Sequence, residues 1–179
     1  METSHAILLR KRKLSDTSLV VSWYAESLGR IETAARGARR PKSPFAGKLD
    51  LFFEAEIQIQ RSRRSHLHTL TEAVLRNPHP GIRQSYLRTQ AASYFVELIE
   101  LTTEPEHPAP ELFHLLQRAF DYLDRQEANL RAVRHFEAEL ARLTGVHDRA
   151  ASEKDPALAL GALFGRLPRS RAALLKALA

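Results

Sequence analysis

The sequence predicts an α+β protein in which a small closed β-barrel comes first and a bundle of helices follows. Three observations indicate this fold class. Short runs with strand-type alternation fill the first 79 residues, apolar residues at helical spacing fill the rest, and the breaker NPHPG separates the two parts. We therefore predict two domains, with the barrel in residues 1–79 and the helices in residues 80–179.

Alternation of apolar and polar residues predicts five strands. The clearest is 49–60, LDLFFEAEIQIQ, where the odd positions are apolar and the even positions are polar except at Phe52. Weaker strand-type runs, separated by turn-type segments, lie at 6–13, 18–24, 30–36 and 67–75. Five short strands before a helical region fit the OB-fold, a five-stranded barrel whose face and loops bind oligonucleotides.

The second domain is predicted to contain three helices and then two shorter ones. Apolar residues recur at helical spacing over 87–99, 112–123 and 130–143. Pro110 suits the first turn of the second helix, and Gly145 suits the end of the third. Around Pro168 we expect short helices after a polar loop, with the loop at 146–155 and the helices at 157–164 and 169–178.

Composition and charge limit the possible functions. The 179 residues are 44% hydrophobic, which is enough for a packed core, and the absence of cysteine excludes disulfides and thiolate zinc sites. We expect no signal peptide and no membrane span, and hence a cytoplasmic protein. The net charge of +6 belongs to residues 1–79, because residues 80–179 hold 13 basic and 13 acidic side chains. A basic surface on one domain suggests a polyanion partner, with a mere solubility charge as the alternative.

Two segments concentrate the positive charge of the barrel domain. Residues 34–48, AARGARRPKSPFAGK, hold five basic side chains and no acidic one, and the glycines and prolines are expected to keep this segment extended. The connection RSRRSH joins the fourth and fifth predicted strands. Mobile cations of this kind suit contacts with phosphates. The predicted DNA-binding residues are Arg36, Arg39, Arg40, Lys42, Lys48, Arg61, Arg63 and Arg64.

Stacking of bases would require aromatic side chains near these segments. Tyr24, Phe45 and Phe52 are the candidates, whereas Trp23 shares a strand face with apolar residues and is expected in the core. For Phe52 the alternative is packing against the helical half, which the sequence favours slightly over stacking.

Three stretches of the sequence carry a family resemblance: HAILLRKRKLSDTSLVVSWYAESLGRI, ARGARRPKSPFAGKLDLFFEAEIQI and AASYFVELIELTTEPEHPAPELFHLLQRAFDYLD. Together they resemble the RecO family of bacterial recombination mediators, over about residues 5–145. The resemblance implies a non-catalytic protein of DNA repair that binds single- and double-stranded DNA and anneals complementary strands. It also implies contact with the acidic C-terminal tail of single-stranded-DNA-binding protein and cooperation with RecR in loading RecA. Many members carry a four-cysteine zinc module, which this chain lacks.

An acidic peptide with an apolar tip needs an apolar pocket and a rim of arginines. These requirements coincide best between the second and third predicted helices, where arginines flank stripes of leucine. The candidate partner-peptide residues are Arg118, Arg125, Arg131 and Arg134. The alternative is that these arginines only balance neighbouring carboxylates, such as Asp121 and Asp124, on solvated helix faces.

No other chemistry is predicted. The sequence has no phosphate-binding glycine motif, no zinc-protease motif and no nucleophile elbow. His66 and His68 share a strand face but lack a third ligand, so they are expected to be surface histidines, and no metal or cofactor is expected. The sequence therefore favours a DNA-binding mediator and annealing protein. The alternative is a non-catalytic adaptor whose helical half holds a partner peptide and whose barrel is a weak nucleic-acid anchor.

Overall fold

The computed structural model describes residues 1–146 and 155–179. The polar loop predicted at 146–155 lies mostly outside the described residues. The chain divides into two compact units, one of Met1–His79 with Glu104–Pro110 and one of Pro80–Thr103 with Glu111–Ala179. None of the helices in the described ranges is long and apolar enough to cross a membrane.

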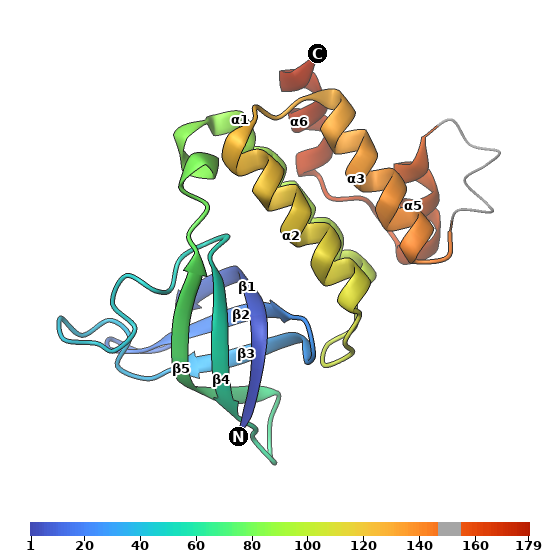
Figure 1. The fold of residues 1–179 in the computed structure, drawn as a ribbon. Coiled ribbons are helices and arrows are strands. Elements are labelled where there is room, and N and C mark those ends of the chain that lie inside the picture. Colours follow the sequence, from blue (N-terminus) through green and yellow to red (C-terminus); the bar gives the residue numbers. More distant parts are fainter. Residues whose placement is uncertain (147–154) are drawn as a thin grey trace. The chain divides into compact units, whose positions relative to one another are not determined.

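The first unit is a closed five-stranded barrel, as the alternation predicted (Figure 1). The strands are β1 (Glu2–Lys13), β2 (Leu19–Ala25), β3 (Gly29–Ala35), β4 (Glu54–Gln60) and β5 (Leu67–Asn77). They close in the order β1-β2-β3-β5-β4, with β3 and β5 parallel and the other neighbours antiparallel. This arrangement confirms the prediction of an OB-fold followed by helices.

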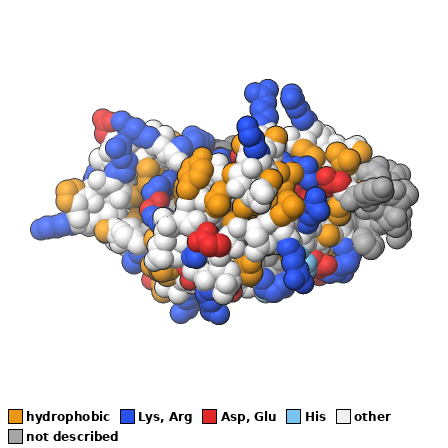
Figure 2. Space-filling model, turned by 90° about the horizontal axis from the view of Figure 1, so that it is seen from above, with side chains coloured by type: hydrophobic (Ala, Val, Ile, Leu, Met, Phe, Trp, Pro, Cys, Tyr) orange, Lys and Arg blue, Asp and Glu red, His pale blue; other side chains and the backbone are white. Residues whose placement is uncertain are grey.

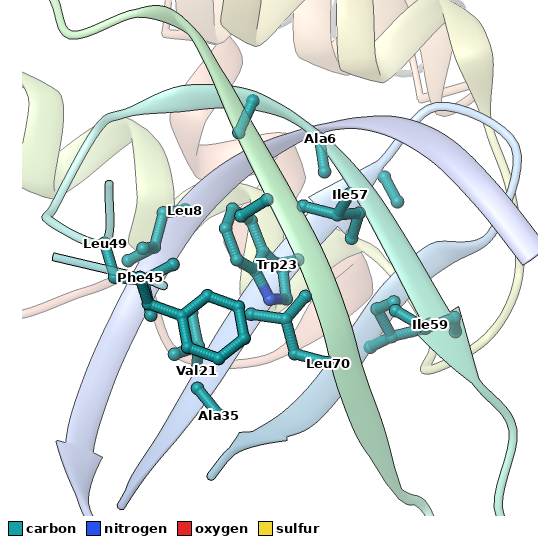
Figure 3. Packing of buried hydrophobic residues seen from close by; sticks show 14 of the residues in the cluster. Ala6, Leu8, Val21, Trp23, Ala35, Phe45, Leu49, Ile57, Ile59 and Leu70 are labelled. Carbon is teal, nitrogen blue, oxygen red and sulfur yellow. The ribbon is translucent and has the colours of Figure 1, made fainter. Parts of the chain in front are cut away.

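Trp23 lies at the centre of the barrel core, as expected (Figure 3). Its ring is fully buried, and its Nε1 donates a hydrogen bond to Thr33 Oγ1 over 2.9 Å. A buried indole N–H left without a partner would be costly, so the threonine lets tryptophan occupy this position. Alternate residues of the strands fill the remaining interior.

The strand predicted at 49–60 is shorter in the structure. β4 begins at Glu54, and residues 49–53 form a turn in which Phe52 adopts a left-handed backbone conformation with φ of 68°. The turn is pinned to β1, because Leu8 N donates to Phe53 O and Phe52 N donates to Leu8 O, over 2.8 and 3.0 Å. Positive φ breaks the pleat of a strand, so the apolar alternation continues through 49–53 although the strand does not.

The second unit contains the predicted helices (Figure 1). Their bounds are η1 (Pro80–Gln84), α1 (Tyr86–Thr102), α2 (Pro110–Arg125), α3 (Leu130–Leu143), α5 (Pro156–Phe164) and α6 (Ser170–Leu178). α2 begins at Pro110, as predicted. α3 ends before Gly145, which takes φ of 75° while Val146 N donates back to Ala141 O over 2.9 Å.

A buried ion-pair network joins helices of the second unit. Glu137 of α3 is fully buried and accepts hydrogen bonds from Tyr94 Oη at 2.6 Å and Arg171 Nε at 2.8 Å. Arg171 of α6 also reaches Asp155, the N-cap of α5, at 2.8 Å. Burial and the neighbouring Glu137 carboxylate raise the pKa of Tyr94. Removing Arg171 would leave the buried carboxylate of Glu137 without its partner in this ion pair, so the network fixes α6 on α3.

Candidate nucleic-acid interface and peptide groove

The basic segment after β3 is anchored by two apolar side chains. Phe45 is only 6% exposed and joins the barrel core together with Leu49, and Figure 3 shows its ring beside Val21 and Leu70. The backbone from residue 37 to residue 48 is a succession of turns rather than the extended segment predicted, because residues 40, 43, 46 and 48 each donate to the carbonyl three residues before. The apolar anchors at the end of these turns fix the segment that carries the cations.

Four cations of this segment are available to a ligand. Arg36, Arg40, Lys42 and Lys48 form no ion pair and no side-chain hydrogen bond among the described residues, and all but the half-buried Lys48 are exposed. On the face shown in Figure 2, lysine and arginine side chains likewise project from the surface and outnumber the acidic ones. Solvent can reach these side chains and no carboxylate in the described residues neutralises them, so they are able to contact phosphates as predicted.

Arg39 differs from its neighbours in the same segment. Its NH1 donates to the carbonyl oxygens of Ser15 and Asp16, both over 3.2 Å, and its backbone N donates to Thr17 O over 3.0 Å. These bonds tie the basic segment to the turn between β1 and β2. Arg39 is consequently a loop-positioning residue whose charge still faces solvent.

The loop between β4 and β5 contains one arginine that forms ion pairs and two that form none among the described residues. Arg61 donates to Glu2 Oε1 through Nε and to Glu106 Oε2 through NH1, each over 2.7 Å. Arg63 and Arg64 are exposed and form no side-chain bond within the described residues. The sequence grouped the three arginines together, but two carboxylates already hold Arg61.

The second of these carboxylates comes from the segment Glu104–Pro110, which joins α1 to α2 and which we call the α1–α2 linker. Glu106 takes φ of 60°, and its N donates to Arg30 O over 2.9 Å. Gly29 has φ of 72°, and a Cβ there would lie 2.4 Å from His107 O, so the linker approaches β3 too closely for any other residue. Backbone contacts thus place the Glu106 carboxylate beside Arg61.

The two histidines of this region occupy different environments. His66 is 94% exposed and lies within hydrogen-bond distance of Glu106, 3.1 Å from its Oε1. His68 is only 2% exposed, accepts a hydrogen bond from Ser62 N and lies 3.5 Å from the same carboxylate oxygen. The hydrogen bond from His66, together with Arg61 and His68, lowers the pKa of Glu106. The expectation of surface histidines was therefore wrong for His68.

A shallow polar groove of about 560 Å³ lies where these loops meet on the barrel. It is lined by Arg36, which directly follows β3, by Arg61, and by hydroxyl side chains of Ser62, Ser65 and Thr69. Guanidinium and hydroxyl donors are the groups that bind phosphate oxygens. No group of three or more His, Asp or Glu side chains in the described ranges could hold a metal ion.

The three aromatic candidates are covered by protein atoms. Tyr24 is fully buried and donates to Ala109 O over 3.3 Å, Phe45 belongs to the barrel core, and Phe52 is 4% exposed. A buried ring offers no face to a base in this conformation. These three rings are therefore not part of the exposed surface of the barrel, and packing of Phe52 against the helical half stays a prediction.

An apolar groove of about 560 Å³ lies between α2 and α3. Its floor includes Phe95 and Phe136, whose rings stack with centroids 4.0 Å apart, and Leu115 lies beside them. Tyr122 and Asn129 stand at one side, joined by a hydrogen bond of 2.8 Å from Asn129 Nδ2 to Tyr122 Oη. The apolar floor can receive a bulky side chain.

Two of the four predicted arginines line this groove. Arg118 and Arg131 do so, whereas Arg125 and Arg134 are exposed elsewhere on the same helices. None of the four forms an ion pair in the described parts of the chain. The charge of Arg118 still contributes to lowering the pKa of Glu139, so a role in balancing carboxylates stays an alternative for this arginine. Glu127 pairs with Arg88 and Asp124 accepts from Gly81 N. The sequence missed Tyr122 and His135, although both fall at helical spacing from the lining arginines.

Comparison with known proteins identifies the family of both units. The model of the N-terminal domain of recombination protein O matches residues 1–79, and the model of its C-terminal domain matches residues 83–147.

Among curated relatives, the DNA repair protein RecO of Rhodopirellula baltica is 36% identical over 140 residues, which are 78% of this chain and 52% of that protein. The RecO of Syntrophus aciditrophicus is 31% identical over 142 residues, 79% of this chain and 55% of that protein. The chain thus spans about half the length of the curated relatives it matches. Two matched domains in the same order, on a barrel and a helical unit of the expected kinds, show that the chain belongs to the RecO family.

Proposed function

We propose that this chain is a non-catalytic DNA-binding protein of bacterial recombinational repair, which anneals complementary strands. The observation that carries the proposal is a set of barrel cations without an ion-pair partner in the described residues, all exposed except the half-buried Lys48: Arg36, Arg40, Lys42, Lys48, Arg63 and Arg64. Contacts of lysine and arginine with phosphates release condensed counterions, which supplies most sequence-independent affinity. The names and family of the relatives support DNA repair as the setting.

Annealing is the activity expected of cations that contact phosphates and not bases. A basic surface that binds phosphates lowers the repulsion between two strands, and it leaves the base edges free to pair. The buried aromatic rings agree with this mechanism, because a strand held by stacking would have to release its bases before pairing. Both single- and double-stranded DNA present the phosphates that such a surface needs.

The groove between α2 and α3 is proposed to bind the acidic C-terminal tail of single-stranded-DNA-binding protein. The stacked Phe95 and Phe136 offer an apolar floor for a terminal aromatic side chain. Arg118 and Arg131, which have no ion-pair partner in the described residues, offer forked donors for its carboxylates. Through this contact the protein would reach coated single strands in the cytoplasm and, with RecR, help to load RecA.

The salt dependence of DNA binding tests whether contacts with phosphates supply the affinity. We expect the affinity for labelled single-stranded DNA to fall steeply with salt, with a slope of log K against log salt of roughly −0.7 for each neutralised phosphate. Unrelated oligonucleotides should bind alike. An affinity that does not change with salt, or a strong preference for one sequence, would refute the phosphate mechanism and favour the adaptor alternative.

The peptide groove has a matched pair of variants. A peptide copying the acidic tail should bind the full chain, and Arg118→Ala with Arg131→Ala should weaken that binding by more than about tenfold. Arg125→Ala with Arg134→Ala removes the same charge from the same helices outside the groove, and it should have little effect. Equal losses in the two double variants would show a general charge effect instead of a site.

A further inference from the structure

The last two helices carry charge of a single sign. Residues 156–179 contain four basic side chains and no acidic one, although residues 80–179 as a whole are neutral. The family match ends at residue 147, so α5 and α6 lie outside the matched segment. Their surface properties therefore need an explanation separate from the α2–α3 groove.

α5 is apolar on every side, but the described residues cover only one side of it. Ala157, Ala159 and Leu160 are buried, whereas Leu158 is 56% and Leu163 is 50% exposed. A surface helix of a globular protein normally carries polar residues on its outer face. Among the described residues, these two half-exposed leucines therefore form an apolar face of α5 that no other segment covers.

A groove of about 560 Å³ lies beside this face, between α5 and the turn that leads into α6. Leu158, Leu167 and Pro168 form its apolar walls, and Gly161 and Ala172 are the small residues between them. A Cβ at Gly161 would lie only 3.0 Å from Leu167 Cγ, so the turn packs closely on the helix. Small residues framed by larger ones leave room for one bulky apolar side chain.

Arginines flank the groove, and they are not equivalent. Arg171 is held by Glu137 and Asp155 and serves the fold. Arg166 and Arg169 are exposed and form no ion pair or side-chain hydrogen bond among the described residues. Their guanidinium groups are therefore available to carboxylates of a ligand.

We propose that the α5–α6 surface is a second docking site, which binds an acidic protein segment carrying a bulky apolar side chain. The charge of the surface selects carboxylates, and the exposed leucines select an apolar partner over a phosphate backbone. Symmetrical pairing of two copies through this surface would bring Arg166 and Arg169 of each copy together, which repulsion opposes.

A designed peptide tests this proposal on the full chain. The probe is a labelled acidic peptide with leucines at helical spacing and glutamates elsewhere, and the control is the same peptide with lysine in place of glutamate. Arg166→Gln with Arg169→Gln should weaken binding of the acidic peptide by about tenfold, since two charge-assisted bonds are lost. Leu158→Ser with Leu163→Ser should weaken it comparably. Lys176→Gln, on α6 outside the groove, should not.

Each other outcome overturns the proposal. If the acidic peptide does not bind, or if the lysine peptide binds equally well, the surface does not select an acidic partner. Loss of binding only in the Arg118 and Arg131 variant assigns the peptide to the α2–α3 groove. Weaker binding of DNA in the Arg166 and Arg169 variant, with the peptide unaffected, makes the surface a nucleic-acid contact. A dimer in sedimentation that Leu158→Ser abolishes makes it a self-association face. Circular dichroism of each variant checks folding, which exposed positions should preserve.

Discussion

The two basic loops of the barrel look alike in sequence and differ in structure. The loop after β3 is fixed by apolar anchors, Phe45 and Leu49, and apart from the bonds of Arg39 its cations have no partner among the described residues. The loop between β4 and β5 is fixed by ion pairs, because Arg61 is held between Glu2 and Glu106. An arginine that holds its own loop in place has fewer donors left for phosphate, so counting cations overestimates a nucleic-acid surface.

The largest expected effect comes from removing the apolar anchor. Phe45→Ala should destabilise the barrel by about 3–5 kcal/mol, because a buried ring is replaced by a cavity in the core. Urea unfolding followed by tryptophan fluorescence measures the change, since Trp23 lies in the same core cluster. Pro44→Ala, at an exposed neighbour, should change the free energy of unfolding little. A stable Phe45→Ala variant would mean that the loop is not anchored through this ring.

The next effect concerns unpaired against paired cations of the same barrel. Changing Arg36, Arg40 and Lys42 to Ala should lower the affinity for single-stranded DNA by at least about tenfold and reduce the salt slope by about 2. Changing Arg12, Lys13 and Arg76 to Ala removes the same charge, but these side chains are paired with Glu32, Asp16 and Glu56. We expect a smaller loss in that control. Equal losses in both triple variants would mean that only total charge matters.

How much of this the sequence could predict depends on the range of the interactions involved. Strand and helix periods are local, so the five strands, the start of α2 at Pro110 and the end of α3 before Gly145 followed from spacing. Residues 49–53 form a turn, yet their sequence alternates as in a strand. The alternation therefore does not reveal the left-handed backbone at Phe52.

The partners of Arg61 could not be predicted, because Glu106 is 45 residues away and reaches the barrel through contacts of the linker backbone. A groove lies between the two helices where the sequence predicted one, since helical spacing places Arg118 and Arg131 near apolar stripes. Spacing alone could not exclude Arg125 and Arg134, because the crossing of two helices decides which face of each lines a groove.

A smaller effect separates Arg39 from its neighbour. Arg39→Ala removes two hydrogen bonds to carbonyl oxygens of Ser15 and Asp16, and it should lower the free energy of unfolding by about 1 kcal/mol. Arg40→Ala removes one unpaired cation and should leave stability unchanged, while DNA affinity falls similarly in both variants. Thermal unfolding and DNA titration of the two single variants measure this difference. Equal stability of the two variants would contradict a positioning role for Arg39.

The smallest effect is a gain of DNA affinity when the ion pair between Arg61 of the β4–β5 loop and Glu106 is removed. Glu106→Gln removes a carboxylate that holds Arg61, and it leaves the guanidinium with Glu2 alone. Because one negative charge disappears beside the loop and donors of Arg61 become available, the affinity for DNA should rise about two- to threefold at low salt. Glu104→Gln, at an exposed position of the same linker, is the matched control and should change the affinity less.

The Glu106→Gln variant should also change how thermal stability depends on pH in acid. The hydrogen bond from His66, with Arg61 and His68 nearby, lowers the pKa of Glu106 in the folded barrel. A carboxyl group whose folded pKa is depressed adds stability above its unfolded pKa, about 4.3, and this contribution is lost as pH falls through the folded value. Glu106→Gln should therefore flatten the decline of the thermal midpoint below about pH 4.3, and Glu104→Gln should not. If Glu106→Gln instead weakens DNA binding and leaves the acid profile unchanged, Arg61 works as a phosphate ligand that needs Glu106 for its orientation, and the contrast between the two loops fails at this residue.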